Sequence, residues 1–206
     1  QLNASASVNG TFSYTPVSGE VLGAGNQTLS AVFTPSDVVN YSTVNKSVAL
    51  TVSKATPTIN VAPTALGITY GKALSNATLS GGNASVAGTF AYASPTTVPS
   101  EGTTSQTVIF SPSNGANYTT VSANVSVTVG KATPTIKVVP RALAIKYGQT
   151  LSNATLSGGS ASVAGTFAFT SPEMVPDVGG ATQSVTFTPT DAVNYNTASA
   201  NVSVTV

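Results

Sequence analysis

The sequence predicts an all-β protein built from tandem antiparallel β-sandwiches. Three observations lead to this fold class. Hydrophobic residues alternate with polar ones over short stretches, no stretch shows helical periodicity, and a block of about 77 residues recurs along the chain. Val and Thr, which fit a pleated and half-buried surface, are abundant throughout.

Internal repeats set the organisation of the chain. Several blocks occur twice almost unchanged: KATPTI at 54–59 and 131–136, SNATLSGG at 75–82 and 152–159, ASVAGTF at 84–90 and 161–167, and NVSVTV at 124–129 and 201–206. A looser copy of the third block, ASVNGTF, stands at 6–12. We therefore divide the chain into a first repeat (residues 1–53), a second repeat (residues 54–130) and a third repeat (residues 131–206).

The first repeat contains no counterpart of residues 54–78, the opening quarter of the second repeat. That quarter carries six large hydrophobic side chains, namely Ile59, Val61, Leu66, Ile68, Tyr70 and Leu74. Burying each would contribute about 1.5–3 kcal/mol, and together they amount to roughly 10 kcal/mol, which is comparable with the net stability of a whole domain. We expect residues 1–53 to expose an apolar groove and an unpaired edge. Preceding chain would fill them, or a strand donated by another subunit.

Each full repeat is predicted to hold six or seven short strands, which the third repeat illustrates. Two strands are expected at 136–138 and 143–147, and alternation continues over 163–169, 185–187 and 202–206. Turns rich in Gly, Pro and Asn separate these stretches. This density of short strands is typical of a small immunoglobulin-type sandwich.

Prolines and glycines refine the opening part of each full repeat. Pro134 and Pro140 interrupt the first strand of the third repeat, which we therefore place on a sheet edge, because Pro cannot donate to a ladder. Gly71 and Gly148 directly follow a Tyr and are predicted to mark a bulge or a turn.

A tyrosine follows an Asn at the same position of every repeat: Tyr41, Tyr118 and Tyr195. We interpret these residues as structural, with the ring packed at the sandwich edge and the hydroxyl capping a backbone group. The alternative is a ring displayed for stacking against a sugar.

The succession KATPTI, ITYG, LSNATLSGG and VAGTF, continuing to FTPTDAVNY and NVSVTV, resembles bacterial Ig-like tandem repeats. The resemblance covers the whole chain. It implies a module of a large secreted or surface-attached protein, such as a stalk, an adhesin shaft or a fibre, and it supplies no catalytic residues. Since the joints at residues 52–56 and 129–133 are too short to be flexible linkers, we expect an extended rod.

Composition argues against an enzyme. The chain has no Cys and no His, so it offers no thiolate nucleophile, no imidazole base and no zinc or copper site of the usual kind. The carboxylates, Glu20, Asp37, Glu101, Glu173, Asp177 and Asp191, show no spacing suited to acid–base pairing or to a calcium loop. We predict no enzymatic activity, no cofactor and no metal site, and we interpret Lys54 and Lys131 as solvated side chains at the joints.

Charge and hydropathy limit the kinds of partner that we expect for the chain. Seven Lys and Arg against six Asp and Glu leave no basic field for a nucleic acid, and no stretch reaches the roughly 18 apolar residues of a membrane helix. The expected partners are further copies of the chain or further Ig-like repeats, joined head to tail with strand donation to residues 1–53. The predicted function is a structural module of an extracellular or cell-surface shaft, stalk or filament. The alternative is an adhesin segment that binds carbohydrate or a partner cell surface.

Eleven of the fifteen Asn residues lie in N-x-[ST] sequons. They are Asn3, Asn9, Asn26, Asn40, Asn45, Asn76, Asn83, Asn117, Asn124, Asn153 and Asn201. The first interpretation is N-glycosylation of an extracellular surface. The second is that a strand face made of Asn, Ser and Thr creates sequons without any glycan, because residues i and i+2 share a face.

Overall fold

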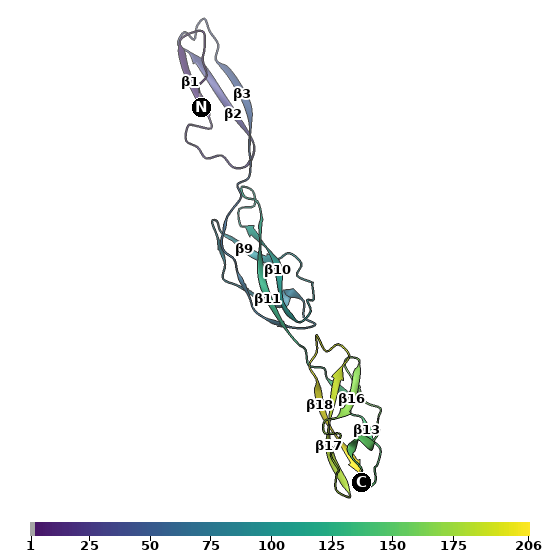
Figure 1. Cartoon of the computed structure of the whole chain (residues 1–206). Helices are drawn as coiled ribbons and strands as arrows, with labels where there is room; N and C mark the ends of the chain where they lie inside the picture. Colours follow the sequence, from purple (N-terminus) through teal and green to yellow (C-terminus); the bar gives the residue numbers. More distant parts are fainter. Residues whose placement is uncertain (1–2) are drawn as a thin grey trace. The chain divides into compact units, whose positions relative to one another are not determined.

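The computed structural model describes residues 3–206, and Gln1 and Leu2 lie outside the described residues. Apart from two 3-10 turns, η1 (Leu74–Asn76) and η2 (Leu151–Asn153), the regular elements within 3–206 are β-strands, which confirms the all-β prediction (Figure 1). The strands are β1 (Gly10–Thr15), β2 (Gly25–Pro35), β3 (Val44–Val52), β4 (Ile59–Val61), β5 (Thr64–Ala65), β6 (Ile68–Thr69), β7 (Leu79–Ser80), β8 (Asn83–Ala84), β9 (Gly88–Tyr92), β10 (Gly102–Pro112), β11 (Val121–Gly130), β12 (Ile136–Val138), β13 (Arg141–Ala142), β14 (Leu156–Ser157), β15 (Ser160–Ala161), β16 (Gly165–Phe169), β17 (Gly180–Pro189) and β18 (Ala198–Thr205).

The chain divides into two compact units. The first comprises residues 1–62, 81–91 and 108–123, and the second comprises residues 63–80, 92–107 and 124–206. The chain as a whole has a tandem immunoglobulin-like β-sandwich fold. The repeat boundaries before Lys54 and Lys131 remain predictions of the sequence.

The third repeat shows the two layers of the sandwich most fully. One layer is the antiparallel sheet β16-β17-β18, in which Val185 of β17 lies opposite Phe169 on one side and Ala200 on the other. The second layer comes from the opening part of the repeat, where β12 pairs with β15 and β13 pairs with β14. The two layers enclose the hydrophobic core.

Two parts of the sequence supply this core. Its buried side chains are Ile145, Leu151, Ala154, Phe169, Val185, Val202 and Val204. The first three belong to the opening segment of the repeat, residues 131–155, and the others belong to the sheet. Leu151 lies on η2 and is held there by its backbone N–H, which donates to the carbonyl oxygen of Met174 at 2.9 Å. The opening segment therefore acts as the cover of the sheet's inner face.

The opening segment differs from the prediction in its details. Pro134 and Pro140 are buried and flank a strand of only three residues, β12. A strand over 143–147 was predicted and is not formed; instead the Ile145 N–H donates to Thr205 O at 3.0 Å. In the second repeat the matching residues form β6, which pairs in parallel with β11. Prolines and glycines on either side keep these pairings short.

Turns fall where glycine predicted them. Gly71 and Gly148, which follow a Tyr, have φ angles of 86° and 83°, a left-handed conformation that favours glycine. Gly158 and Gly159, at φ angles of 66° and 87°, connect β14 to β15. The two short strands themselves were not predicted, because two residues carry no measurable alternation.

A glycine beneath an aromatic ring recurs in all three repeats. A Cβ atom at Gly165 would overlap both the ring of Phe187 and the carbonyl oxygen of Thr188 on the neighbouring strand. The same arrangement joins Gly10 to Phe33 and Gly88 to Phe110. Each ring also packs on a second Phe across the strand pair, at centroid distances of 4.9 to 5.0 Å. The V-x-G-T-F pattern thus encodes a close approach between two strands.

We expect Gly165→Ala to destabilise the third repeat by about 1–3 kcal/mol, because the new methyl group displaces the Phe187 ring from a packed position. The matched control is Gly180→Ala, because nothing lies within contact distance of an added Cβ there. Denaturant unfolding followed by circular dichroism compares the two variants. Equal stabilities would contradict the role given to this glycine.

Candidate functional site: the uncovered face of the first repeat

The first repeat consists of one sheet without its cover. β1, β2 and β3 form an antiparallel sheet in the order β1-β2-β3, with Phe12 opposite Phe33 and Leu29 opposite Val48. By position in the repeat, Val48 and Leu50 of β3 correspond to Val125 and Val127 of β11 and to Val202 and Val204 of β18, all of which are buried. They therefore lie on the face that forms the core in the complete repeats.

The exposed fractions of equivalent side chains in the three repeats show the effect of the missing cover. Val48 is 62% exposed, whereas its counterparts Val125 and Val202 are each 5% exposed. Leu50 is 39% exposed, whereas Val127 and Val204 are fully buried. The sequence-based expectation of an exposed apolar face on residues 1–53 is confirmed for the described residues of this repeat.

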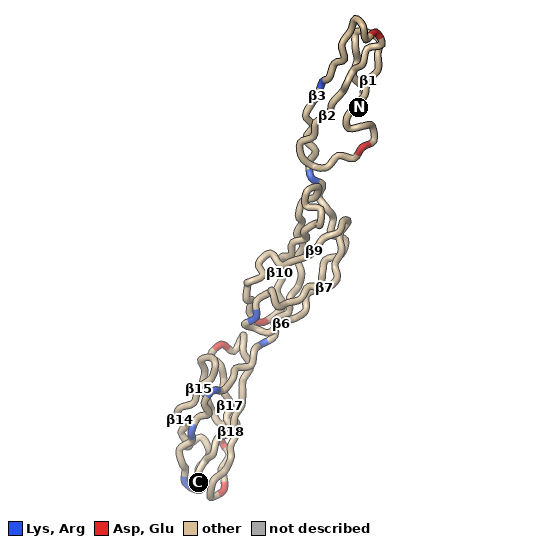
Figure 2. The backbone as a smooth tube through the Cα atoms, turned by 180° about the vertical axis from the view of Figure 1, so that it is seen from behind, with Lys and Arg blue, Asp and Glu red and all other residues tan. Residues whose placement is uncertain are grey.

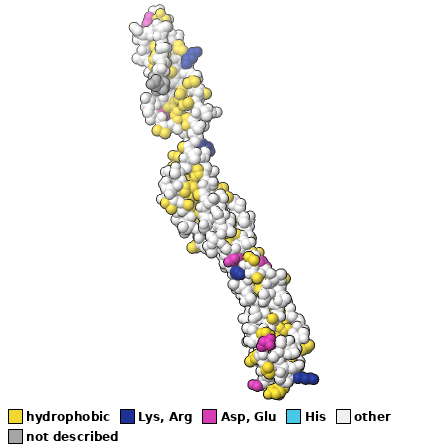
Figure 3. Space-filling view, in the orientation of Figure 1, with side chains coloured by type: hydrophobic (Ala, Val, Ile, Leu, Met, Phe, Trp, Pro, Cys, Tyr) yellow, Lys and Arg dark blue, Asp and Glu magenta, His cyan; other side chains and the backbone are white. Residues whose placement is uncertain are grey.

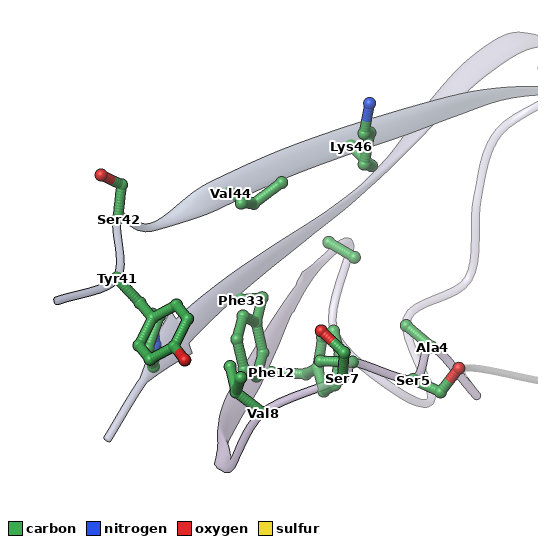
Figure 4. Close-up of a pocket in the computed structure, with 13 residues that line it drawn as sticks. Ala4, Ser5, Ser7, Val8, Phe12, Phe33, Tyr41, Ser42, Val44 and Lys46 are labelled. Carbon is green, nitrogen blue, oxygen red and sulfur yellow. The ribbon is translucent and has the colours of Figure 1, made fainter. Parts of the chain in front are cut away.

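A groove of about 450 Å³ lies along this face. Its lining residues are Ala4, Ser5, Ala6, Ser7, Val8, Phe12, Ala31, Phe33, Pro35, Tyr41, Ser42, Val44 and Lys46. Figure 4 shows Val8, Phe33 and Tyr41 gathered at one end of the groove, with Val44 on the strand above them. Figure 3 shows hydrophobic side chains on the visible surface of this part of the chain. The groove is predominantly apolar and open.

A second cavity of about 290 Å³ extends the same face past Tyr14 and Val48. Lys46 lines both cavities. The residues at its position in the complete repeats are Ala123 and Ala200, both half-buried. Lys46 is therefore a charged residue at a core-facing position, and the sequence analysis did not single it out.

The loop before β3 carries an ordered Asp–Asn pair. The Asn40 side chain donates to Asp37 Oδ2 at 2.8 Å, and this bond, together with the Asn40 backbone N–H, holds the pKa of Asp37 below its ordinary value of 3.8. Asp191 and Asn194 make the same side-chain bond at 2.9 Å, and the pKa of Asp191 is lowered for the same reasons. Both carboxylates are fully exposed, so the pair orders the loop rather than a core.

In the complete repeats this loop makes contacts across each joint. Asn117 Oδ1 accepts a hydrogen bond from the Ala24 N–H at 2.7 Å, and both residues belong to the first unit. Asn194 Oδ1 accepts one from the Glu101 N–H at 2.9 Å, and both residues belong to the second unit. The two bonds join equivalent positions, 93 residues apart in each case. The Asn-Tyr dipeptide marked this loop in the sequence, but nothing in the sequence indicated the bond.

The two joint lysines also contact this loop. Lys54 Nζ donates to the carbonyl oxygen of Gly115, and Lys131 Nζ donates to that of Ala192 at 2.6 Å. Both lysines are exposed, as expected for solvated side chains at the joints, but the sequence did not indicate these two hydrogen bonds. Each one fixes the start of an opening segment to the loop before the last strand.

The tyrosines differ between the repeats. Tyr118 and Tyr195 are half-buried, and their backbones form parallel bridges with Ala55 and Ala132. The Tyr195 ring also meets the edge of Tyr70 at a centroid distance of 5.3 Å. Tyr41 is 50% exposed and lines the groove. The capping role predicted for the three hydroxyl groups stays a prediction.

The sequon asparagines lie mostly on the surface. All are exposed except Asn117, which is half-buried at the joint. Several side chains already take part in local hydrogen bonds, such as Asn76 with Ala73 O and Asn153 with Thr150 O. Glycosylation of these residues remains a prediction.

Ionisable groups are few and scattered along the chain (Figure 2). Among residues 3–206, no three His, Cys, Asp or Glu side chains come together as a metal site would require. Within the same residues, no helix is long and apolar enough to cross a membrane. The groove on the first repeat is the candidate site for a ligand or partner that we consider further.

We expect Val202→Ala to destabilise the third repeat by about 2 kcal/mol, because it opens a cavity beneath the cover. The equivalent change in the first repeat, Val48→Ala, should alter stability by less than about 0.5 kcal/mol, since that side chain is already exposed. Amide hydrogen exchange, measured separately for β18 and for β3, reports the stability of each of the two repeats. Equal losses would mean that the face of the first repeat is covered in solution.

The Asp–Asn loops predict a pH effect. Since the folded pKa of Asp37 and Asp191 lies below the unfolded value, their contribution to stability is full above about pH 4. It is lost as the pH falls through the folded pKa. Asn40→Ala should raise the pKa of Asp37 towards 3.8 and leave Asp191 unchanged, as carboxyl carbon NMR can measure. A parent Asp37 that already titrates at its ordinary value would contradict this.

No family model matches the chain, and no curated protein matches it. The solved structures that it resembles include cadherin and immunoglobulin domains. Drosophila N-cadherin EC1-4 has 12% identity, a TM-score of 0.23 and coverage of 91% of this chain. Sidekick-1 immunoglobulin domains 1-5 have 13% identity, a TM-score of 0.33 and coverage of 89%. Zebrafish RET cadherin-like domains 1 to 4 have 12% identity, a TM-score of 0.29 and coverage of 95%. The chain spans 60%, 45% and 65% of these structures, respectively.

Proposed function

We propose that the chain is a non-enzymatic structural module of an extracellular surface shaft, stalk or filament, related to the bacterial Ig-like tandem repeats that its motifs resemble. The observation that supports this most is the recurrence of one set of contacts at two joints. An Asn side chain accepts a hydrogen bond from a backbone N–H of the preceding repeat. A Lys amine donates a hydrogen bond to a backbone carbonyl oxygen of the loop that carries this Asn. Joints made twice from the same contacts suit a protein that spans distance.

The first repeat extends this proposal to assembly. Its uncovered face presents Val48 and Leu50 where the complete repeats bury valines. A strand supplied from outside residues 3–53 would complete it, as in donor-strand complementation. Contacts of this head-to-tail kind generate open filaments.

A second candidate function is adhesion to carbohydrate. The half-exposed Tyr41 ring lies beside Phe33 in the groove and offers an apolar platform of the kind on which sugars stack. A glycan array probed with the chain and with Tyr41→Ala separates the two functions. Binding that Tyr41→Ala abolishes would favour the adhesin, and no binding would favour the shaft.

For the shaft, the joint between the second and third repeats is the test. We expect ¹⁵N relaxation to show these two repeats reorienting together in the parent chain. Asn194→Ala removes the acceptor of the Glu101 N–H, a bond worth about 1 kcal/mol, and should make their motions more independent. Asn201→Ala, on the exposed face of β18, is the matched control. Independent motion in the parent chain would contradict the proposal.

A further inference from the structure

We propose that the uncovered face of the first repeat, which carries the groove, Val48 and Leu50, binds a segment with the sequence pattern of residues 54–77, in a register that the complete repeats define. This inference rests on the strand complementation proposed above and names its ligand. The segment starts at the loop 38–42 with a Lys-Ala-Thr sequence and runs parallel to β3. It places a Leu and an Ala of the Leu-Ser-Asn-Ala type over Val48 and Leu50.

The first anchor is the loop before β3. In the second repeat the Ala55 N–H donates to Asn117 O, and the Thr119 N–H donates to Ala55 O, both at 2.9 Å. The third repeat makes the same pair of bonds between Ala132 and the Asn194–Asn196 loop, at 2.9 and 2.8 Å. The atoms in these positions of the first repeat are the carbonyl oxygen of Asn40 and the N–H of Ser42.

These two backbone groups are free to receive a segment. Within residues 3–206, neither the Asn40 carbonyl oxygen nor the Ser42 N–H takes part in a described hydrogen bond, and both residues are exposed. The Asp37–Asn40 bond already holds the loop in the form that Asp191 and Asn194 have beside a bound segment. The carbonyl of Val38 stands where those of Gly115 and Ala192 receive a lysine amine. The loop is therefore preorganised for a Lys-Ala sequence.

The second anchor lies at the far end of β3. Ile68 pairs in parallel with Val129, and the Tyr70 N–H donates to Gly130 O at 2.8 Å. In the third repeat the equivalent contact is a single hydrogen bond, from the Ile145 N–H to the carbonyl oxygen of Thr205. The equivalent positions in the first repeat are Thr51 to Ser53. Since the first anchor precedes β3 and the second ends it, the bound segment runs parallel to β3.

After the second anchor in the chain, two side chains of the segment provide the apolar contact. Leu74 and Ala77 are 1% and 2% exposed in the second repeat, and Leu151 and Ala154 are 1% and 6% exposed in the third. The 3-10 turn that carries each Leu has the sequence Leu-Ser-Asn in both repeats. The face that they cover is the one that Val48 and Leu50 leave exposed in the first repeat. A segment of this pattern therefore matches the groove in backbone register and in side-chain chemistry.

The probe is a synthetic peptide with the sequence of residues 54–80, added to the ¹⁵N-labelled full chain. We expect saturable binding, with shifts of the Ser42, Val48 and Leu50 amides, while the amides of Thr119 and Asn196 stay unchanged. In the peptide, Leu74→Asp should weaken binding about a hundredfold, because it places a carboxylate in the apolar groove. In the protein, Val48→Asp should do the same, whereas Ala49→Asp, on the opposite face of β3, should not.

A second measurement avoids dependence on variants that fail to fold. A chain with an additional copy of residues 54–77 placed directly before Gln1 should show hydrogen exchange at the Ser42 amide slowed about tenfold or more relative to the parent. Unchanged exchange at Ser42, or equal binding of the parent and Leu74→Asp peptides, would overturn the inference. Either result would leave the relaxation test of the joint unaffected, so failure here is distinct from failure of the proposed shaft.

Discussion

Every repeat in this chain depends on covering the inner face of its closing strands. A sheet of the β16-β17-β18 type has one face of valine and phenylalanine side chains, and each large side chain contributes about 1.5–3 kcal/mol when it leaves water. The cover is a segment with little regular structure of its own: a few two- or three-residue strands and one 3-10 turn. Its stability comes from a few side chains, Leu151 foremost, that fill the space over Val202 and Val204.

The cover and the joint are made by the same stretch of chain. Lys131 and Ala132 begin the opening segment by binding the loop at Asn194, and the residues that follow close the core. A repeat therefore acquires its core and its attachment to the preceding chain in one continuous piece. In residues 3–53 the two corresponding features, the face of β3 with Val48 and Leu50 and the loop 38–42, are both exposed.

Much of the fold could be predicted because the same sequence pattern occurs in more than one repeat. Alternation located β16, β17 and β18, and the missing quarter of the first repeat predicted an exposed apolar groove there, although not which residues form the exposed face. The opening segment was harder, since prolines and glycines break its alternation and a strand expected over 143–147 is replaced by single hydrogen bonds. The side-chain roles of Asn117 and Lys54 could not be predicted, because both depend on residues that are about 60 to 93 positions away in the sequence.

Lys46 makes the uncovered sheet of the first repeat less prone to stack against another apolar sheet face. A broad apolar sheet face that waits for a partner is prone to stack against another of its kind, and proteins counter this with inward-pointing charges. An ammonium group at a position that other repeats fill with Ala keeps two such faces apart, because closing them together would bury two like charges. Lys46 thus places a positive charge within the exposed apolar face of the first repeat, which disfavours direct stacking of two such faces.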